Sequence, residues 1–149
     1  MTITFVAGLG FRAHTTCEAL QQVLEQALRT AERGQLLPVQ LRALATAEDK
    51  RSHPAFVQLA AELGLPVRPV PLALLVAQDL PPSQHVPARY GAHSLAEAAC
   101  LAAAGRGAVL AAPRHISADG SATAAIATAA TVTVTIAATA LNPFQTPVP

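Results

Sequence analysis

The chain has 149 residues, of which 52% are hydrophobic and 13% are charged, so it can bury enough apolar surface to fold as one domain without disulfides or a metal. Its 10 Lys and Arg residues are balanced by 9 Asp and Glu residues, and it has four Phe, one Tyr and no Trp. The sequence therefore offers neither a basic field nor a base-stacking surface, and we predict no nucleic-acid partner.

Three further features bear on where the protein acts. Cys17 and Cys100 are far apart and show no CxxC spacing, which favours free thiols and a reducing, cytoplasmic setting. The N-terminus lacks the basic segment and the long apolar run of a signal peptide. The uncharged stretch 122–141 is as long as a membrane span, but Ala and Thr make up most of it, so we predict no membrane partner.

The first half of the chain alternates short apolar runs with helical patterns. Residues 3–7 predict a buried strand, and residues 16–34 carry apolar residues at three- and four-residue spacing between an N-capping Thr and a terminal Gly. The pattern then repeats with a strand at 41–47, a helix from about 54 to 63, a strand at 67–70 and a brief helix at 71–77. Several prolines predict an irregular loop from there to His93.

The second half of the chain begins with a capping-box pattern. Ser94 is followed three residues later by Glu97, which predicts a helix that ends at Gly105. Strands follow at 108–112 and 122–127, joined by a polar connection. We therefore predict a single three-layer α/β domain over residues 1–127, with a mostly parallel sheet of about five strands flanked by helices. Residues 128–149 form a Thr/Ala-rich extension and a Pro-containing tail.

The segment from Gly8 to Arg12 is predicted to be a turn after the first strand, where backbone N–H groups receive a phosphate or a carboxylate. It matches a dinucleotide-binding pattern, but the acidic residue expected about 20 residues later is missing, since Glu48 lies much farther on. A turn kept small only for packing is the plainer alternative. Arg12 and the neighbouring Thr15 favour capture of an anion.

Other polar residues follow or flank the remaining strands at the same edge of the predicted sheet. They are Thr46, Glu48, Lys50, Arg114 and Thr123. Glu48 and Lys50 are the best candidates for an acid and base pair, although charged pairs in loops are more often solvated salt bridges.

Ser117 and Asp119 lie in the same region as His115, but no activating motif surrounds the serine, and a hydrolase triad is not predicted. The five histidines show no metal-ligand spacing on any one helix. We therefore predict no bound metal, and the motifs imply no cofactor.

Four groups of residues resemble, in order and spacing, the CobE and CbiG C-terminal family of cobalamin biosynthesis. They are residues 6–12 (VAGLGFR), 43–46 (ALAT) with Lys50, 63–67 (LGLPV), and 94–99 (SLAEAA) followed by Pro113-Arg114 and residues 122–127 (ATAAIA). The resemblance covers roughly residues 3–127. The family usually has Lys where this chain has Arg114, which keeps the cation but changes its shape.

The resemblance implies a role in building the corrin ring, whose tetrapyrrole precursors carry many carboxylates. It favours an accessory protein that binds a precorrin or corrin intermediate through residues Gly8, Gly10, Arg12, Thr15, Thr46, Lys50, Arg114 and Thr123. One alternative is a hydrolase that acts on a lactone-bearing precorrin during ring contraction, with Glu48 as base and Lys50 as electrophile. Another is a scaffold that contacts other enzymes of the cobalamin pathway.

Overall fold

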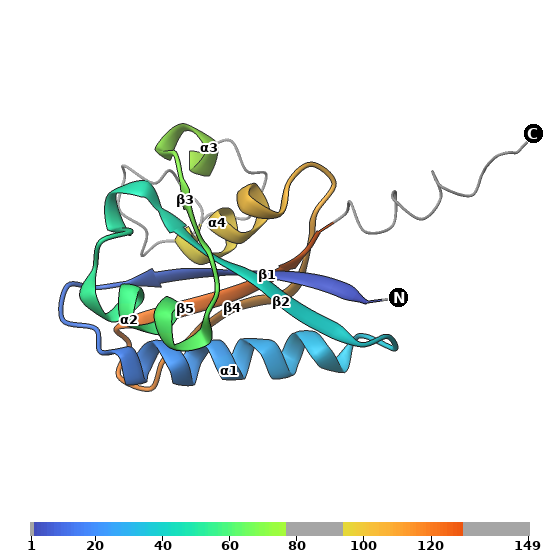
Figure 1. Ribbon diagram of the computed structural model, residues 1–149, viewed down its shortest axis with the longest axis horizontal. Coiled ribbons are helices and arrows are strands. Elements are labelled where there is room, and N and C mark those ends of the chain that lie inside the picture. Colours follow the sequence, from blue (N-terminus) through green and yellow to red (C-terminus); the bar gives the residue numbers. More distant parts are fainter. Residues whose placement is uncertain (1, 77–93, 130–149) are drawn as a thin grey trace, which may run out of the picture.

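The computed structural model describes residues 2–76 and 94–129 (Figure 1). Its strands are β1 (Ile3–Phe11), β2 (Val39–Ala47), β3 (Val67–Val70), β4 (Val109–Ile116) and β5 (Ala122–Thr128). Its helices are α1 (Cys17–Arg33), the short 3₁₀ helix η1 (Glu48–Lys50), α2 (Pro54–Leu63), α3 (Leu72–Val76) and α4 (Leu95–Ala104). The predicted loop before residue 94 and the tail after residue 129 lie outside the described residues.

The five strands form one sheet in the order β3-β2-β1-β5-β4. Strands β1, β2 and β3 are parallel, whereas β5 is antiparallel to both β1 and β4. Four strands therefore run in one direction and β5 alone runs in the other. The carboxyl ends of β1, β2, β3 and β4 meet the start of β5 at one edge of the sheet, which we call the carboxyl edge.

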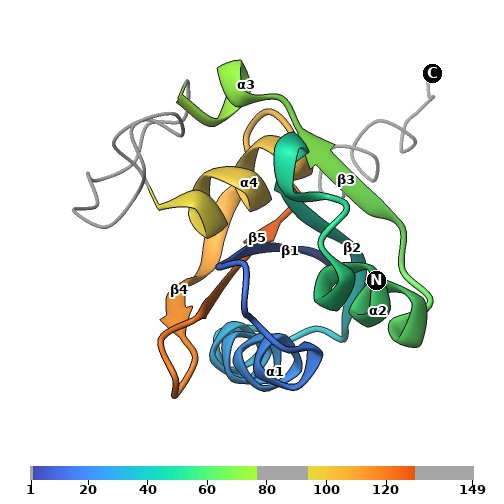
Figure 2. The same cartoon turned by 90° about the vertical axis from the view of Figure 1, so that its left-hand side faces the viewer.

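Helices cover both faces of the sheet, which confirms the predicted three-layer α/β fold (Figure 2). Helices α1 and α2 pack on one face and helices α3 and α4 on the other. The predicted helix caps are also observed at α1 and α2. The Thr16 hydroxyl accepts a hydrogen bond from the Ala19 N–H at 3.1 Å, and Gly64 ends α2 in the left-handed conformation at φ 66°.

The face under α1 and α2 is filled by large side chains. Phe5, Leu9 and Phe11 alternate along β1 toward this face, as the two-residue period of a strand requires. Phe56 on α2 and Ile126 on β5 complete the cluster and are fully buried.

The face under α4 is instead lined by small residues. Val6, Gly8 and Gly10 alternate along β1 toward this helix, and the neighbouring strands contribute Ala43, Ala45, Ala47, Ala125 and Ala127. A Cβ atom on Gly8 would lie 2.7 Å from the Cys100 backbone nitrogen and closer still to the Ala96 carbonyl oxygen. The backbone of α4 therefore packs directly against β1, and only glycine fits at position 8.

This packing corrects the predicted turn from Gly8 to Arg12. β1 continues to Phe11, and Gly8 is paired with Ala45 on one side and with Ala125 on the other. The prediction ended the strand at Gly8 because glycine often terminates strands, whereas here the glycine admits a helix.

Two other predictions of local structure are also corrected. β4 extends through Pro113 to Ile116, so Arg114 lies within a strand rather than in a connection. The predicted capping box of α4 does not form, because the Glu97 Oε2 atom accepts a hydrogen bond from the Arg114 backbone N–H at 3.1 Å. Ser94 is the N-cap residue, but its side chain makes no capping hydrogen bond.

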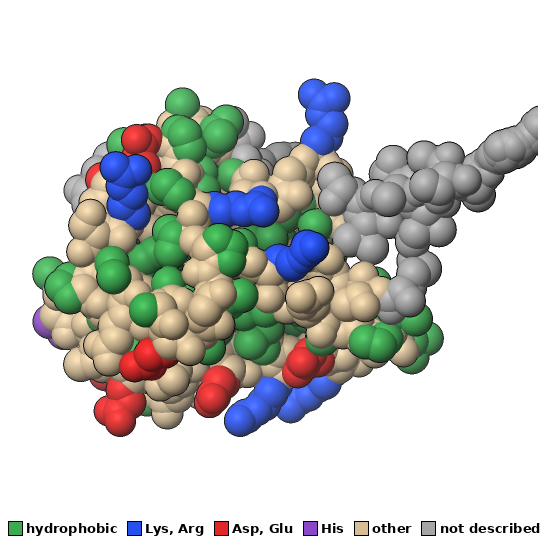
Figure 3. Space-filling view, viewed as in Figure 1, with side chains coloured by type: hydrophobic (Ala, Val, Ile, Leu, Met, Phe, Trp, Pro, Cys, Tyr) green, Lys and Arg blue, Asp and Glu red, His purple; other side chains and the backbone are tan. Residues whose placement is uncertain are grey.

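Within residues 2–76 and 94–129, no helix is long and apolar enough to cross a membrane. The same residues contain no group of three or more His, Cys, Asp or Glu side chains that could hold a metal ion. Figure 3 shows both acidic and basic side chains on one face of the molecule, in keeping with the formal net charge of +1.

Candidate functional site

The loop between β1 and α1, residues 12–16, lies at the centre of the carboxyl edge and is held by the β4–β5 hairpin. The Arg12 backbone N–H donates to both the Ser121 carbonyl oxygen and the Thr15 hydroxyl, each at 3.0 Å. The buried Thr15 hydroxyl in turn donates to the Ser121 carbonyl oxygen at 2.8 Å. Thr15 therefore fixes the loop against the hairpin rather than facing solvent.

The hairpin is itself ordered by one carboxylate. Asp119 Oδ1 accepts hydrogen bonds from the Ser117 hydroxyl at 2.7 Å, the Ser121 hydroxyl at 2.8 Å and the Ser121 N–H at 2.9 Å. The Ser117 hydrogen bond is the largest of the causes that lower the pKa of Asp119 to about 2. Because the Ser117 hydroxyl donates to a carboxylate and not to a histidine, no Ser-His-Asp triad exists here.

The η1–α2 segment holds the same loop from the opposite side. Lys50 Nζ donates to the Phe11 carbonyl oxygen at 2.6 Å and lies 5.4 Å from the centroid of the Phe11 ring. His53 Nδ1 accepts from the Ala55 N–H at 3.1 Å, so Nε2 carries the proton and donates to the Ala13 carbonyl oxygen at 2.9 Å. The loop after β1 is thus fixed by contacts on both sides.

The two residues nominated for acid–base chemistry have structural partners. Glu48 is exposed, and its Oε2 atom accepts from the Leu72 N–H at 3.1 Å, at the start of α3. Lys50 donates to Phe11, as described above. Cys100 is no alternative nucleophile, because burial, with a smaller contribution from Glu97, raises the pKa of its thiol far above the ordinary value.

Two of the predicted binding residues are buried away from the surface of the edge. Thr46 is fully buried, and its hydroxyl donates to the Leu9 carbonyl oxygen at 2.8 Å. Gly8 lies in the central strand beneath α4. Both residues shape the sheet, because Thr46 joins β2 to β1 and Gly8 admits α4.

The remaining predicted residues do gather at the carboxyl edge. Arg12 is exposed on the fixed loop, and within the described residues its guanidinium makes no hydrogen bond or ion pair. Thr123 is half-buried, with its hydroxyl 3.4 Å from the Gly10 carbonyl oxygen. Arg114 is also half-buried, near the end of β4.

Sequence reasoning missed His53 and Ser121, whose roles depend on contacts between segments distant in the chain.

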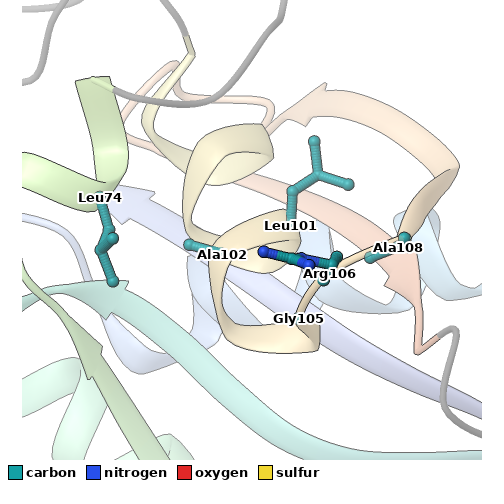
Figure 4. Close-up of a pocket in the computed structure, with 7 residues that line it drawn as sticks. Leu74, Leu101, Ala102, Gly105, Arg106 and Ala108 are labelled. Carbon is teal, nitrogen blue, oxygen red and sulfur yellow. The ribbon is translucent and has the colours of Figure 1, made fainter.

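A separate hollow lies at the opposite end of α4 (Figure 4). Its volume is about 340 Å³, and it is lined by Leu74, Leu101, Ala102, Gly105, Arg106, Gly107 and Ala108. Figure 4 shows Leu101 and Arg106 among the residues that line it. None of the predicted site residues lines this hollow.

Comparison with known proteins decides the family. The family described as "Cobalamin synthesis G C-terminus" matches residues 5–127, which include all the site residues described above. The chain belongs to this CobE/CbiG family of cobalamin biosynthesis. "Protein CobE" of Sinorhizobium sp. is 36% identical over 130 residues, which are 85% of this chain and 81% of the relative.

Solved structures agree with this assignment. A crystal structure of CobE, described as a protein from the cobalamin (vitamin B12) biosynthetic pathway, has a TM-score of 0.69 and 33% identity and covers 85% of this chain and 90% of its own. The cobalamin biosynthesis protein chiG of Agrobacterium tumefaciens str. C58 has a TM-score of 0.63 and 32% identity, covering 85% and 98%. A cobalamin biosynthesis protein G homologue from Sulfolobus solfataricus, at 18% identity and a TM-score of 0.61, shares the fold over 85% of this chain and 37% of its own.

Proposed function

We propose that this CobE/CbiG-family protein binds a precorrin or corrin intermediate through the carboxylates of the macrocycle, at the carboxyl edge of the sheet. The observation that carries the proposal is the Arg12 guanidinium, which is exposed and has no partner among the described residues on a loop that is held from both sides. Such a guanidinium pairs with a carboxylate through two parallel hydrogen bonds.

The fixed loop favours binding because it lowers the entropy lost when the complex forms. The backbone of residues 11–15 is already held by Lys50, His53 and Ser121 in the free protein. The backbone of this loop therefore loses little entropy when the Arg12 side chain is ordered by the ligand, which leaves more of the interaction energy as affinity.

Binding without catalysis is the better-supported role. The hydrolase alternative needs a base and an electrophile that are available to substrate, and Glu48 and Lys50 each hold a backbone group instead. We therefore propose an accessory protein that holds an intermediate or passes it to other enzymes of the pathway. Because both Cys17 and Cys100 are free thiols, we expect it to act in the cytoplasm.

Titration of the purified protein with hydrogenobyrinic acid, followed by the tetrapyrrole absorption, tests the proposal. We expect saturable binding by the wild type and a roughly tenfold weaker Kd for Arg12→Ala, the loss of one charge-assisted pair. Arg29→Ala, on the exposed side of α1, is the matched control and should bind like the wild type. Absence of binding by the wild type to this compound and to earlier precorrins would overturn the proposal.

A parallel assay with a lactone-bearing precorrin tests for catalysis. Conversion of a lactone-bearing precorrin by the wild type but not by Glu48→Gln would establish the hydrolase instead. Equal binding of hydrogenobyrinic acid by Arg12→Ala and Arg29→Ala would move the binding site away from the loop after β1.

A further inference from the structure

The amino end of α4 has a polar group without a partner. Ser94 is the N-cap residue, with extended backbone at φ −61° and ψ 129°, and the residue is 2% exposed. Within residues 2–76 and 94–129, its hydroxyl has no hydrogen-bond partner. A buried hydroxyl with no partner is rare in folded proteins because its desolvation is not offset.

Neither hydrogen bond of the capping box expected from the sequence is made. The Glu97 carboxylate, which would accept from the Ser94 backbone N–H, accepts from the Arg114 N–H instead, and the Ser94 hydroxyl makes no capping hydrogen bond. Among the described residues, no side chain therefore caps the N–H groups in the first turn of α4, in contrast to α1 and α2, where Thr16 and His53 supply one. The first N–H groups of a helix have no partner within the helix and carry the positive end of its dipole.

This helix end lies at the carboxyl edge, beside residues already assigned to the site. A Cβ atom on Gly10 would lie 3.4 Å from Leu95 Cδ2 and 2.7 Å from the Thr123 hydroxyl. Because Gly10 has no side chain, the first turn of α4 can pack close to β1 and β5 at this edge. Arg12 follows Gly10 by two residues on the same strand end.

We propose that the Ser94 hydroxyl and the first-turn N–H groups of α4 bind a carboxylate of the tetrapyrrole, as a second anchor beside Arg12. A serine at an N-cap carries its hydroxyl next to these N–H groups, so hydroxyl and amides converge on one anion. The nearby negative charge, Glu97, is held toward β4 by the Arg114 backbone. This inference rests on the proposed function, because it names the second point at which the same ligand is held.

Two substitutions of Ser94 test the inference. For both we expect an unchanged or higher Tm together with weaker binding of the ligand. Ser94→Ala removes a hydroxyl that has no partner, so we expect an unchanged or slightly higher Tm and a Kd for hydrogenobyrinic acid about five- to tenfold weaker. Ser94→Asp places a carboxylate of the protein itself on the vacant N–H groups. We expect it to raise the Tm and to bind hydrogenobyrinic acid more weakly than Ser94→Ala does.

Thr128→Ala is the matched control, because it removes a hydroxyl at the opposite end of the sheet, where Thr128 Oγ1 donates to the Val109 carbonyl oxygen at 3.3 Å. It should leave the affinity unchanged. If Ser94→Ala instead lowers the Tm and leaves the affinity unchanged, Ser94 is only structural and the inference fails while the proposed function stands.

A small anion separates failure of the inference from failure of the proposed function. Acetate, compared with chloride at equal ionic strength, should raise the Tm of the wild type more than that of either Ser94 variant. If the wild type does not bind hydrogenobyrinic acid but shows this acetate effect, the anion site stands and the proposed ligand is wrong. If acetate affects all three proteins equally, the anion site is wrong.

Discussion

The two faces of the sheet are packed by opposite means. On the α1 face, Phe5, Phe56 and Ile126 fill the space between sheet and helices. On the α4 face, glycine and alanine leave so little side chain that the helix backbone itself meets β1. The first face is stabilised by large side chains that fill the space, and the second requires small side chains so that the helix can approach the sheet. Large-to-small changes should therefore damage one face, and small-to-large changes the other.

The largest effect is expected on the α1 face. Phe56→Ala leaves a cavity among fully buried side chains, and we expect the free energy of unfolding to fall by about 3–5 kcal/mol. Urea denaturation measures this change. Val57→Ala, at the neighbouring residue, which is 49% exposed, is the control and should change stability by less than about 0.5 kcal/mol. Similar losses in the two variants would contradict the described core.

The α4 face is broken by adding one methyl group. In Gly8→Ala the new Cβ would meet the backbone of α4, which cannot move aside as a side chain can, so we expect a loss of about 1–3 kcal/mol. Gly34→Ala is the control, since Gly34 has a negative φ of −88° and its Cβ would have only the Ala31 carbonyl oxygen, at 3.9 Å, within contact distance. Equal stability of the two variants in urea would show that α4 does not pack closely on β1.

The smallest change in stability is expected in the β4–β5 hairpin, at the carboxyl edge of the sheet. The pKa of Asp119 is lowered from 3.8 to about 2 in the folded protein, so its carboxylate stabilises the fold above pH 3.8 and this contribution is lost as the pH falls toward 2. Asp119→Asn should therefore be less stable than the wild type near neutral pH, with the difference shrinking below pH 3.8. Urea midpoints across this range measure it, and a difference that grows on acidification would contradict the assigned contacts.

Local signals predicted the helices well. Thr16 caps α1 and Gly64 ends α2 through atoms only a few residues away, so sequence patterns contain the whole interaction. The alternation of strands and helices likewise predicted the three-layer fold, because each strand needs both faces covered.

Contacts between distant segments explain the errors. Gly8 looked like a strand terminator, and only the position of Cys100 and the rest of α4 shows why a glycine continues the strand. Glu97 had the correct spacing for a capping box, but the Arg114 N–H, 17 residues away, is its partner. Thr46 was placed correctly at the end of β2, yet no local pattern shows that its hydroxyl turns to Leu9. Residue type and strand end were predictable, whereas the direction and partner of each side chain were not.

The reversed direction of β5 also governs when the edge can form. Because β5 enters the sheet next to the end of β1, the Thr15 hydroxyl reaches the Ser121 carbonyl oxygen across 106 residues of sequence. Closing so long a loop is slow, since chain entropy must be lost before the contact is gained. A nascent chain that has made β1, α1, β2 and α2 but not β5 therefore holds the Arg12 loop from one side only, through Lys50 and His53. The loop acquires its second support only after the last described strand has joined the sheet.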